Sequence, residues 1–152
     1  MIQQEKNNSS ILIVGCGSIG LRHLRNLQSL GENNIAVCDS NSTRLAQTTS
    51  SLNVSGYDNL TEALDFLSPI GVIICTPPNL HVHQALEAVR SDASVFIEKP
   101  LSHSMDGVDG LFSEARNRNK IIQIGYNFRF HKGLRMITVS YTHLRAHETD
   151  SY

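Results

Sequence analysis

Short, continuous apolar runs alternate along this chain with longer segments in which apolar residues recur every three or four positions. Each apolar run stops at a glycine, an aspartate or a proline turn, which is typical of buried strands. The longer segments have the spacing of amphipathic helices. We expect strands at 11–14, 35–38, weakly around Tyr57, at 71–75, 95–97 and 121–124, and helices at 18–30, 42–52, 61–67, over Val82 to Val89 and over Val108 to Ala115. This alternation predicts an α/β fold, a doubly wound parallel sheet covered on both faces.

A Gly-x-Gly-x-x-Gly run leaves the first expected strand and opens the first expected helix. In that context each glycine has a task in binding a dinucleotide. Gly15 permits the tight turn, Gly17 lets the backbone approach a pyrophosphate, and Gly20 lets the helix pack closely on the strand. The first helical residues, Ser18 and Ile19, offer unpaired N–H groups to the phosphates. We therefore expect a Rossmann domain that binds NAD or NADP.

The choice between NAD and NADP depends on Asp39, which ends the second expected strand. A carboxylate there accepts hydrogen bonds from the adenosine ribose and repels a 2′-phosphate, which favours NAD. NADP is the alternative, because Ser40, Asn41 and Arg44 follow and are able to hold a phosphate. The other interpretation of Asp39 is a solvated turn residue that caps the next helix.

Composition and net charge bear on the possible partners of the protein more than on its function. The 152 residues are 40% hydrophobic and carry a net charge of −1, which favours a globular fold and gives no case for a nucleic-acid or membrane partner. Three scattered cysteines without metal-ligand spacing predict reduced thiols and no metal site. Residues 1–9 are polar, so we expect a disordered N-terminus, no signal peptide and a cytoplasmic protein.

Three further motifs follow the glycine run along the chain. They are Thr76-Pro77-Pro78-Asn79 with His81, Glu98-Lys99-Pro100, and Gly125-Tyr126-Asn127 with Arg129. Together with the glycines they resemble the Gfo/Idh/MocA oxidoreductases over about residues 10–136. The resemblance implies a homo-oligomeric two-domain enzyme. Its Rossmann domain, here 10–126, binds NAD(P), and its second domain covers a sugar-like or cyclitol substrate. A hydride then moves between a secondary alcohol carbon and the nicotinamide.

The resemblance also implies roles for single residues. Lys99 would be the catalytic lysine, hydrogen-bonded to the reacting hydroxyl, with a cis peptide before Pro100. The residues implied to contact or orient the cofactor are Thr76, Pro77, Asn79, His81, Glu98, Lys99 and, near the nicotinamide ribose, Asn127. A lysine before proline is otherwise an ordinary surface turn. A metal pair of His81 and His83 is disfavoured, because this spacing puts them on different helix faces.

The C-terminal part departs from the family. The histidine that serves as acid/base partner of the lysine belongs to the second domain, of which only residues 127–138 resemble the start. Residues 139–149 match, at every position, one translated frame of a common transposase sequencing adapter. We therefore expect residues 139–152 to be non-native and the substrate domain to be truncated, which would leave this fragment inactive. The alternative is a genuine basic tail, with His143 and His147 spaced like a metal pair.

Two functional interpretations remain open. The first is an oxidoreductase, represented by its dinucleotide-binding part. The second is a non-catalytic NAD-binding sensor, since fold alone does not decide between them. Lys99 within Glu-Lys-Pro favours the enzyme, because a sensor has no need of that lysine.

Overall fold

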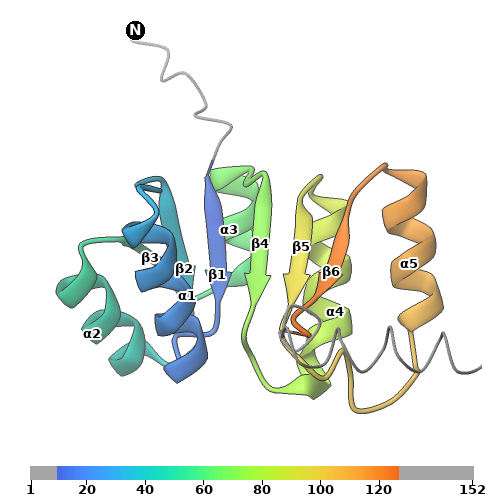
Figure 1. Ribbon diagram of the computed structural model, residues 1–152, viewed down its shortest axis with the longest axis horizontal. Coiled ribbons are helices and arrows are strands. Elements are labelled where there is room, and N and C mark those ends of the chain that lie inside the picture. The colour runs from blue at the N-terminus through green and yellow to red at the C-terminus, as the bar shows by residue number, and fades with distance from the viewer. Residues whose placement is uncertain (1–9, 127–152) are drawn as a thin grey trace, which may run out of the picture.

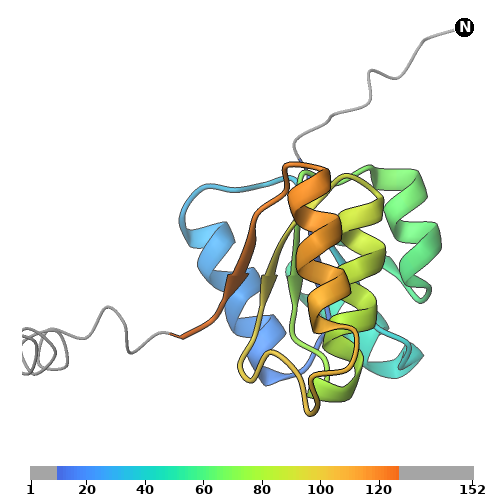
Figure 2. The same cartoon turned by 90° about the vertical axis from the view of Figure 1, so that its right-hand side faces the viewer.

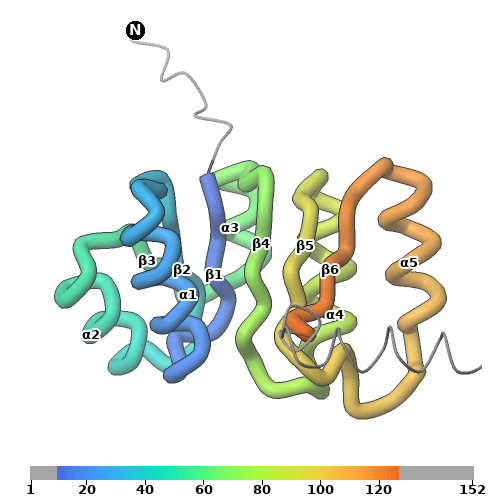
Figure 3. The backbone as a smooth tube through the Cα atoms, in the orientation of Figure 1, coloured from blue at the N-terminus to red at the C-terminus, as the bar shows by residue number. Residues whose placement is uncertain are grey.

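The computed structural model describes residues 10–126, which form one parallel sheet flanked by helices (Figures 1 and 3). The strands are β1 Ile11–Val14, β2 Ile35–Cys38, β3 Ser55–Tyr57, β4 Gly71–Ile74, β5 Ser94–Ile97 and β6 Ile122–Ile124. The helices are α1 Ser18–Ser29, α2 Ser42–Leu52, α3 Leu60–Leu67, α4 Pro78–Arg90 and α5 Val108–Asn117. The order across the sheet is β3-β2-β1-β4-β5-β6. The predicted doubly wound parallel sheet is confirmed.

Helices cover both faces of the sheet, which explains why the central strands are continuously apolar. Successive residues of β1 point to opposite faces, so Ile13 packs with Leu24 of α1 on one face. On the other face, Leu12 packs in a cluster with Leu64 of α3 and Leu111 of α5. Figure 2 shows α1 on one side of the sheet and α3, α4 and α5 on the other. Each face therefore has its own apolar core.

The strand order reverses at β1, which pairs with β2 on one side and β4 on the other. Ile11 is in register with Ile35 of β2 and with Gly71 of β4. Ligands of open α/β sheets bind beyond the carboxyl ends of the strands at such a switch point. Because all the strands are parallel, the residues that follow β1, β2, β4 and β5 meet at this one edge.

Most element boundaries agree with the sequence prediction to within two residues, and the fourth helix is the main exception. It begins at Pro78, four positions before the first periodic apolar residue, Val82. Proline suits the first helical position, where its missing N–H has no partner to lose. Consequently the Thr-Pro-Pro turn is also the start of α4. Within residues 10–126 no helix is long and apolar enough to cross a membrane.

Candidate functional site

The three glycines after β1 are required for different reasons. Gly15 has φ +98°, a left-handed conformation, and a Cβ there would lie 2.9 Å from the Cys75 carbonyl carbon. A Cβ on Gly20 would overlap the carbonyl oxygen of Gly15, so α1 approaches the loop as closely as backbone allows. At Gly17, by contrast, a Cβ would meet no atom of residues 10–126 within 4 Å. Gly15 and Gly20 serve the fold, whereas Gly17 leaves open space above the loop.

The start of α1 is free to receive an anion. Gly17 is the N-cap residue and supplies no side-chain acceptor, and the first turn contains no acidic residue. The N–H groups of the first helical residues, including the exposed Ser18 and Ile19, are therefore not satisfied by a capping side chain. Unpaired N–H groups and the positive end of the helix dipole suit the pyrophosphate of a dinucleotide.

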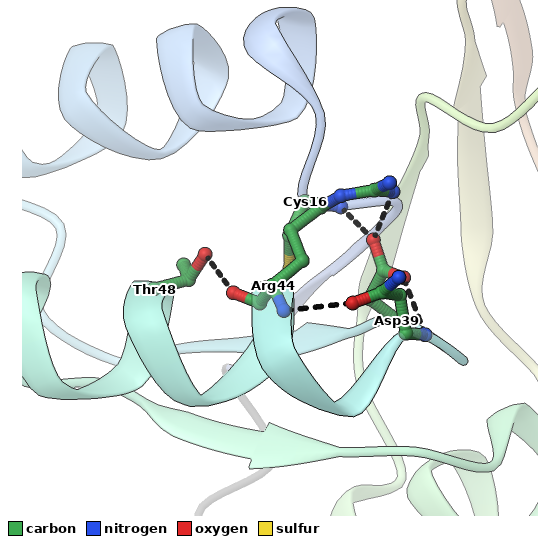
Figure 4. A network of polar contacts seen from close by, with 5 residues as sticks. Cys16, Asp39, Arg44 and Thr48 are labelled. Carbon is green, nitrogen blue, oxygen red and sulfur yellow. Dashed lines mark hydrogen bonds and ion pairs between the residues drawn. The ribbon is translucent and has the colours of Figure 1, made fainter.

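Asp39 is a buried carboxylate that links the glycine loop to the start of α2 (Figure 4). Its Oδ2 accepts a hydrogen bond from the Cys16 backbone N–H at 2.8 Å and pairs with Arg44 Nη1 at 3.1 Å. Its Oδ1 accepts from the Asn41 backbone N–H at 2.8 Å. The N-cap of α2 is Asn41, whose side chain accepts from the Arg44 N–H. The interpretation of Asp39 as a solvated helix cap is therefore wrong.

A cavity of about 590 Å³ lies over this edge of β1, β2 and β4. Of the residues predicted from the sequence to bind the cofactor, Gly15, Gly17, Asp39, Thr76 and Pro77 line it. Ser40, Asn41 and Arg44, which the sequence offered as ligands of an NADP phosphate, line it as well. The structure adds two further polar residues, Asp58 and Gln84. Nothing in the sequence marked Asp58, after β3, or Gln84, which accepts a hydrogen bond from the Thr76 hydroxyl.

Lys99 lies in an exposed turn after β5 and lines a second cavity of about 540 Å³. No hydrogen bond or ion pair joins its ammonium to another of the residues 10–126, so the side chain is free to meet a ligand. Glu98 and Ile19 line the same cavity. Glu98 accepts a hydrogen bond from the Lys99 backbone N–H at 3.2 Å, and the Lys99–Pro100 peptide is cis, as the resemblance implied.

The remaining residues that the sequence assigned to the cofactor do not line either cavity in the described part of the chain. Asn79 is exposed in the first turn of α4 and lines neither cavity. His81 is 1% exposed, and both its ring nitrogens lie against backbone carbonyl oxygens. Asn127 lies outside the described residues. Their contacts with a cofactor stay predictions.

The three cysteines are free thiols within the sheet and its loops, in agreement with the sequence prediction. Burial, together with smaller contributions from Cys16 and nearby carboxylates, raises the pKa of the Cys38 thiol to about 12. Burial and the charge of Asp39 also raise the pKa of Cys16, which lies inside the glycine loop. At neutral pH these thiols are protonated and do not compete as nucleophiles.

The geometry fits a dinucleotide: an uncapped helix start, a glycine that leaves room for phosphate, and a carboxylate at the end of β2. Residues 9–126 match the family model described as oxidoreductase family, NAD-binding Rossmann fold. The chain belongs to the Gfo/Idh/MocA oxidoreductases. NAD is therefore its cofactor class, and the resemblance inferred from the motifs is confirmed.

Relatives within the family include several inositol dehydrogenases. The chain is 27% identical to a myo-inositol 2-dehydrogenase of Thermotoga maritima over 127 residues, which cover 82% of this chain and 38% of that protein. It is 30% identical to an inositol 2-dehydrogenase of Salmonella typhimurium, covering 80% and 38%. The crystal structure of a Lactobacillus plantarum myo-inositol 2-dehydrogenase superimposes with a TM-score of 0.77 at 27% identity, covering 85% and 39%. The chain thus spans about two fifths of the length of these relatives.

Proposed function

We propose that this chain supplies the NAD-binding half of an oxidoreductase that transfers a hydride between the nicotinamide and a secondary hydroxyl of a sugar, a cyclitol or a derivative. The observation that carries this proposal is that residues at the start of α1 line two separate cavities. Gly17 lines the one that holds Asp39, and Ile19 lines the one that holds Lys99. A dinucleotide laid across Gly17 and Ile19 would place its adenosine beside Asp39 and its nicotinamide beside Lys99.

The residues of this chain have distinct tasks in that reaction. Bound NAD supplies the hydride acceptor at its nicotinamide. The Lys99 ammonium donates a hydrogen bond to the reacting hydroxyl oxygen and stabilises the negative charge that develops there. Asp39 holds the adenosine ribose, and the N–H groups of α1 hold the pyrophosphate.

The polyol substrate class is supported by the names of the relatives, inositol dehydrogenases among them. A secondary alcohol needs a donor to its oxygen at a fixed distance from the nicotinamide, and the free Lys99 ammonium is such a donor. A sensor would need the first cavity and the glycine loop but not this ammonium. We therefore propose the enzyme over the regulatory module.

The experiment has two stages. The gene is first sequenced in one long read across the codon for Thr138, and the reading frame found there is expressed. That protein is then mixed with NAD and, in turn, myo-inositol, scyllo-inositol and hexoses, and NADH formation is followed by absorbance. We expect turnover of at least one polyol and its loss in Lys99→Met, a variant that should still bind NADH. NADH binding without turnover of any secondary alcohol would favour the sensor.

A further inference from the structure

We infer that His23 and His81 are positioning residues that clamp the Lys99 turn from the two faces of the sheet. This inference rests on the proposed role of Lys99. Lys99 is exposed and lies two positions beyond Ile97, the last residue of β5. It is therefore outside the sheet, and sheet hydrogen bonds do not fix the direction of its side chain. The residues on either side of it, Glu98 and Pro100, are each held by a histidine.

His23 holds the turn from the α1 face. Its Nε2 lies 2.8 Å from Glu98 Oε1, across 75 positions of sequence, and both side chains are about three-quarters buried. The ring packs edge-on against Phe96 of β5, with 5.4 Å between the centroids, so its orientation is fixed. The other oxygen of Glu98 accepts from the Lys99 backbone N–H. A continuous path of hydrogen bonds therefore joins the helix at the pyrophosphate site to the backbone of Lys99.

His81 holds the turn from the α4 face. Its Nδ1 lies 2.9 Å from the Pro100 carbonyl oxygen, and its Nε2 lies 2.7 Å from the Thr76 carbonyl oxygen. The imidazole thus bridges the turn after β4 to the turn after β5. A carbonyl oxygen only accepts, so a ring nitrogen that carries the proton donates to the carbonyl it faces. The ring is 1% exposed, so water cannot replace either bond.

Hydride transfer requires a fixed position of the Lys99 ammonium, which the two histidines would provide. The ammonium of Lys99 has to stay within hydrogen-bond reach of a hydroxyl whose carbon faces the nicotinamide, and small displacements are costly. Thr76 lines the first cavity and Lys99 the second. By joining these turns, His81 ties the position of the ammonium to the cavity that takes the adenosine, and His23 ties it to α1.

The test uses the 152-residue chain and the position of the lysine as its readout. Reductive methylation with ¹³C-formaldehyde labels the four lysines Lys6, Lys99, Lys120 and Lys132, and Lys99→Arg assigns the Lys99 signal. The variants are His23→Phe and His81→Phe, which keep a ring and remove the hydrogen bonds, and His23→Gln, whose amide still donates to Glu98. His83→Phe is the matched control, since His83 lies on the same helix as His81 with its side chain 79% exposed.

We expect NADH to shift the Lys99 signal in the wild type, in His83→Phe and in His23→Gln. In His23→Phe and His81→Phe, measured at NADH concentrations that saturate each variant, the shift should be lost or broadened. An unchanged Lys99 shift in a folded His23→Phe that binds NADH would overturn the clamp. If His81→Phe fails to fold, His81 is tested through its own ring: ¹⁵N spectra of the wild type should show a ring N–H that is protected from exchange with water, and a rapidly exchanging ring N–H would refute the bridge. If the wild-type chain does not bind NADH, the proposed function fails, whereas the ring measurement still decides the bridge.

Discussion

Gly17→Ala should separate cofactor binding from folding. A Cβ at this position meets no atom of residues 10–126 within 4 Å, and φ −70° with ψ −176° is a conformation that alanine adopts without strain. The side chain would, however, project into the space above the glycine loop where we place the pyrophosphate. The substitution should therefore leave the fold intact and weaken NADH binding.

The stability change is the sum of two opposing effects. Alanine restricts the unfolded chain and stabilises the protein by about 0.4–1 kcal/mol. Alanine is also a poorer N-cap than glycine, which costs roughly 1 kcal/mol. The free energy of unfolding should therefore change by less than about 1 kcal/mol, and Tm by less than about 4 °C. For binding, loss of one charge-assisted hydrogen bond from phosphate costs about 1.5–3 kcal/mol, which raises the Kd for NADH between about tenfold and 150-fold.

Two other glycine variants make the comparison interpretable. Gly110→Ala lies on the exposed side of α5 with no atom of the described chain near its Cβ, so it should stabilise slightly and leave binding alone. Gly20→Ala should destabilise by about 3 kcal/mol, the upper end of the usual cost of overpacking, because its Cβ overlaps the Gly15 carbonyl oxygen. The chain contains no tryptophan, so Kd is measured from NADH fluorescence directly and Tm by calorimetry. Wild-type affinity in Gly17→Ala would refute the placement of the pyrophosphate.

Three more predictions follow from particular contacts. Arg44→Gln should raise the Kd for NADP about tenfold more than the Kd for NAD, because the half-exposed guanidinium is the cation nearest Asp39; an unchanged ratio in a titration of both cofactors would exclude Arg44 from specificity. Burial raises the pKa of Cys38 from 9.0 to about 12, so the unfolded chain releases this proton at lower pH than the folded chain does. The contribution of Cys38 to the free energy of unfolding is therefore fully present below about pH 9. It is lost between about pH 9 and pH 12, by up to about 1.4 kcal/mol per pH unit. Urea unfolding at about pH 8 and about pH 10.5 should show a smaller loss in Cys38→Ala than in the wild type, and equal losses would contradict the shift. Leu111→Ala should cost about 2–5 kcal/mol in denaturant unfolding, against about 0.5 kcal/mol for the exposed Met105→Ala; similar costs would mean that α5 does not seal the core.

The fold could be predicted from the sequence because a strand that is buried on both faces is continuously apolar. β1, β2 and β4 consist almost wholly of apolar residues, and each stops where the parallel sheet presents its ligand-binding edge. The helix over residues 78–90 shows the limit of such patterns. Of the four periodic residues, Ala85 and Val89 are buried, whereas Val82 and Leu86 are only partly buried and His81 lies on the buried face. The polar side chain of His81 concealed part of the buried face and the true start of the helix.

The candidate site could be predicted only where its residues are close together in the sequence. The glycine loop and the Glu-Lys-Pro turn are local motifs, and the structure places each at the expected edge. The pairing of His23 with Glu98 depends on the sheet order, which brings β5 beside β4 and leaves α1 over the same edge. Likewise, the ion pair of Arg44 with Asp39 depends on a side-chain direction that a carboxylate's spacing from the glycines does not specify.

The polar groups around Lys99 also indicate what this half of the site does not supply. Oxidation of a secondary alcohol sends the hydride to the nicotinamide and the hydroxyl proton to a base. An ammonium has no acceptor, so Lys99 in its charged form stabilises the oxyanion without taking that proton. Of the side chains that line this cavity with Lys99 within residues 10–126, the imidazole of His23 and the carboxylate of Glu98 already hydrogen-bond each other. We therefore expect the proton acceptor to come from residues beyond 126, and the described part alone to bind NADH without oxidising a polyol.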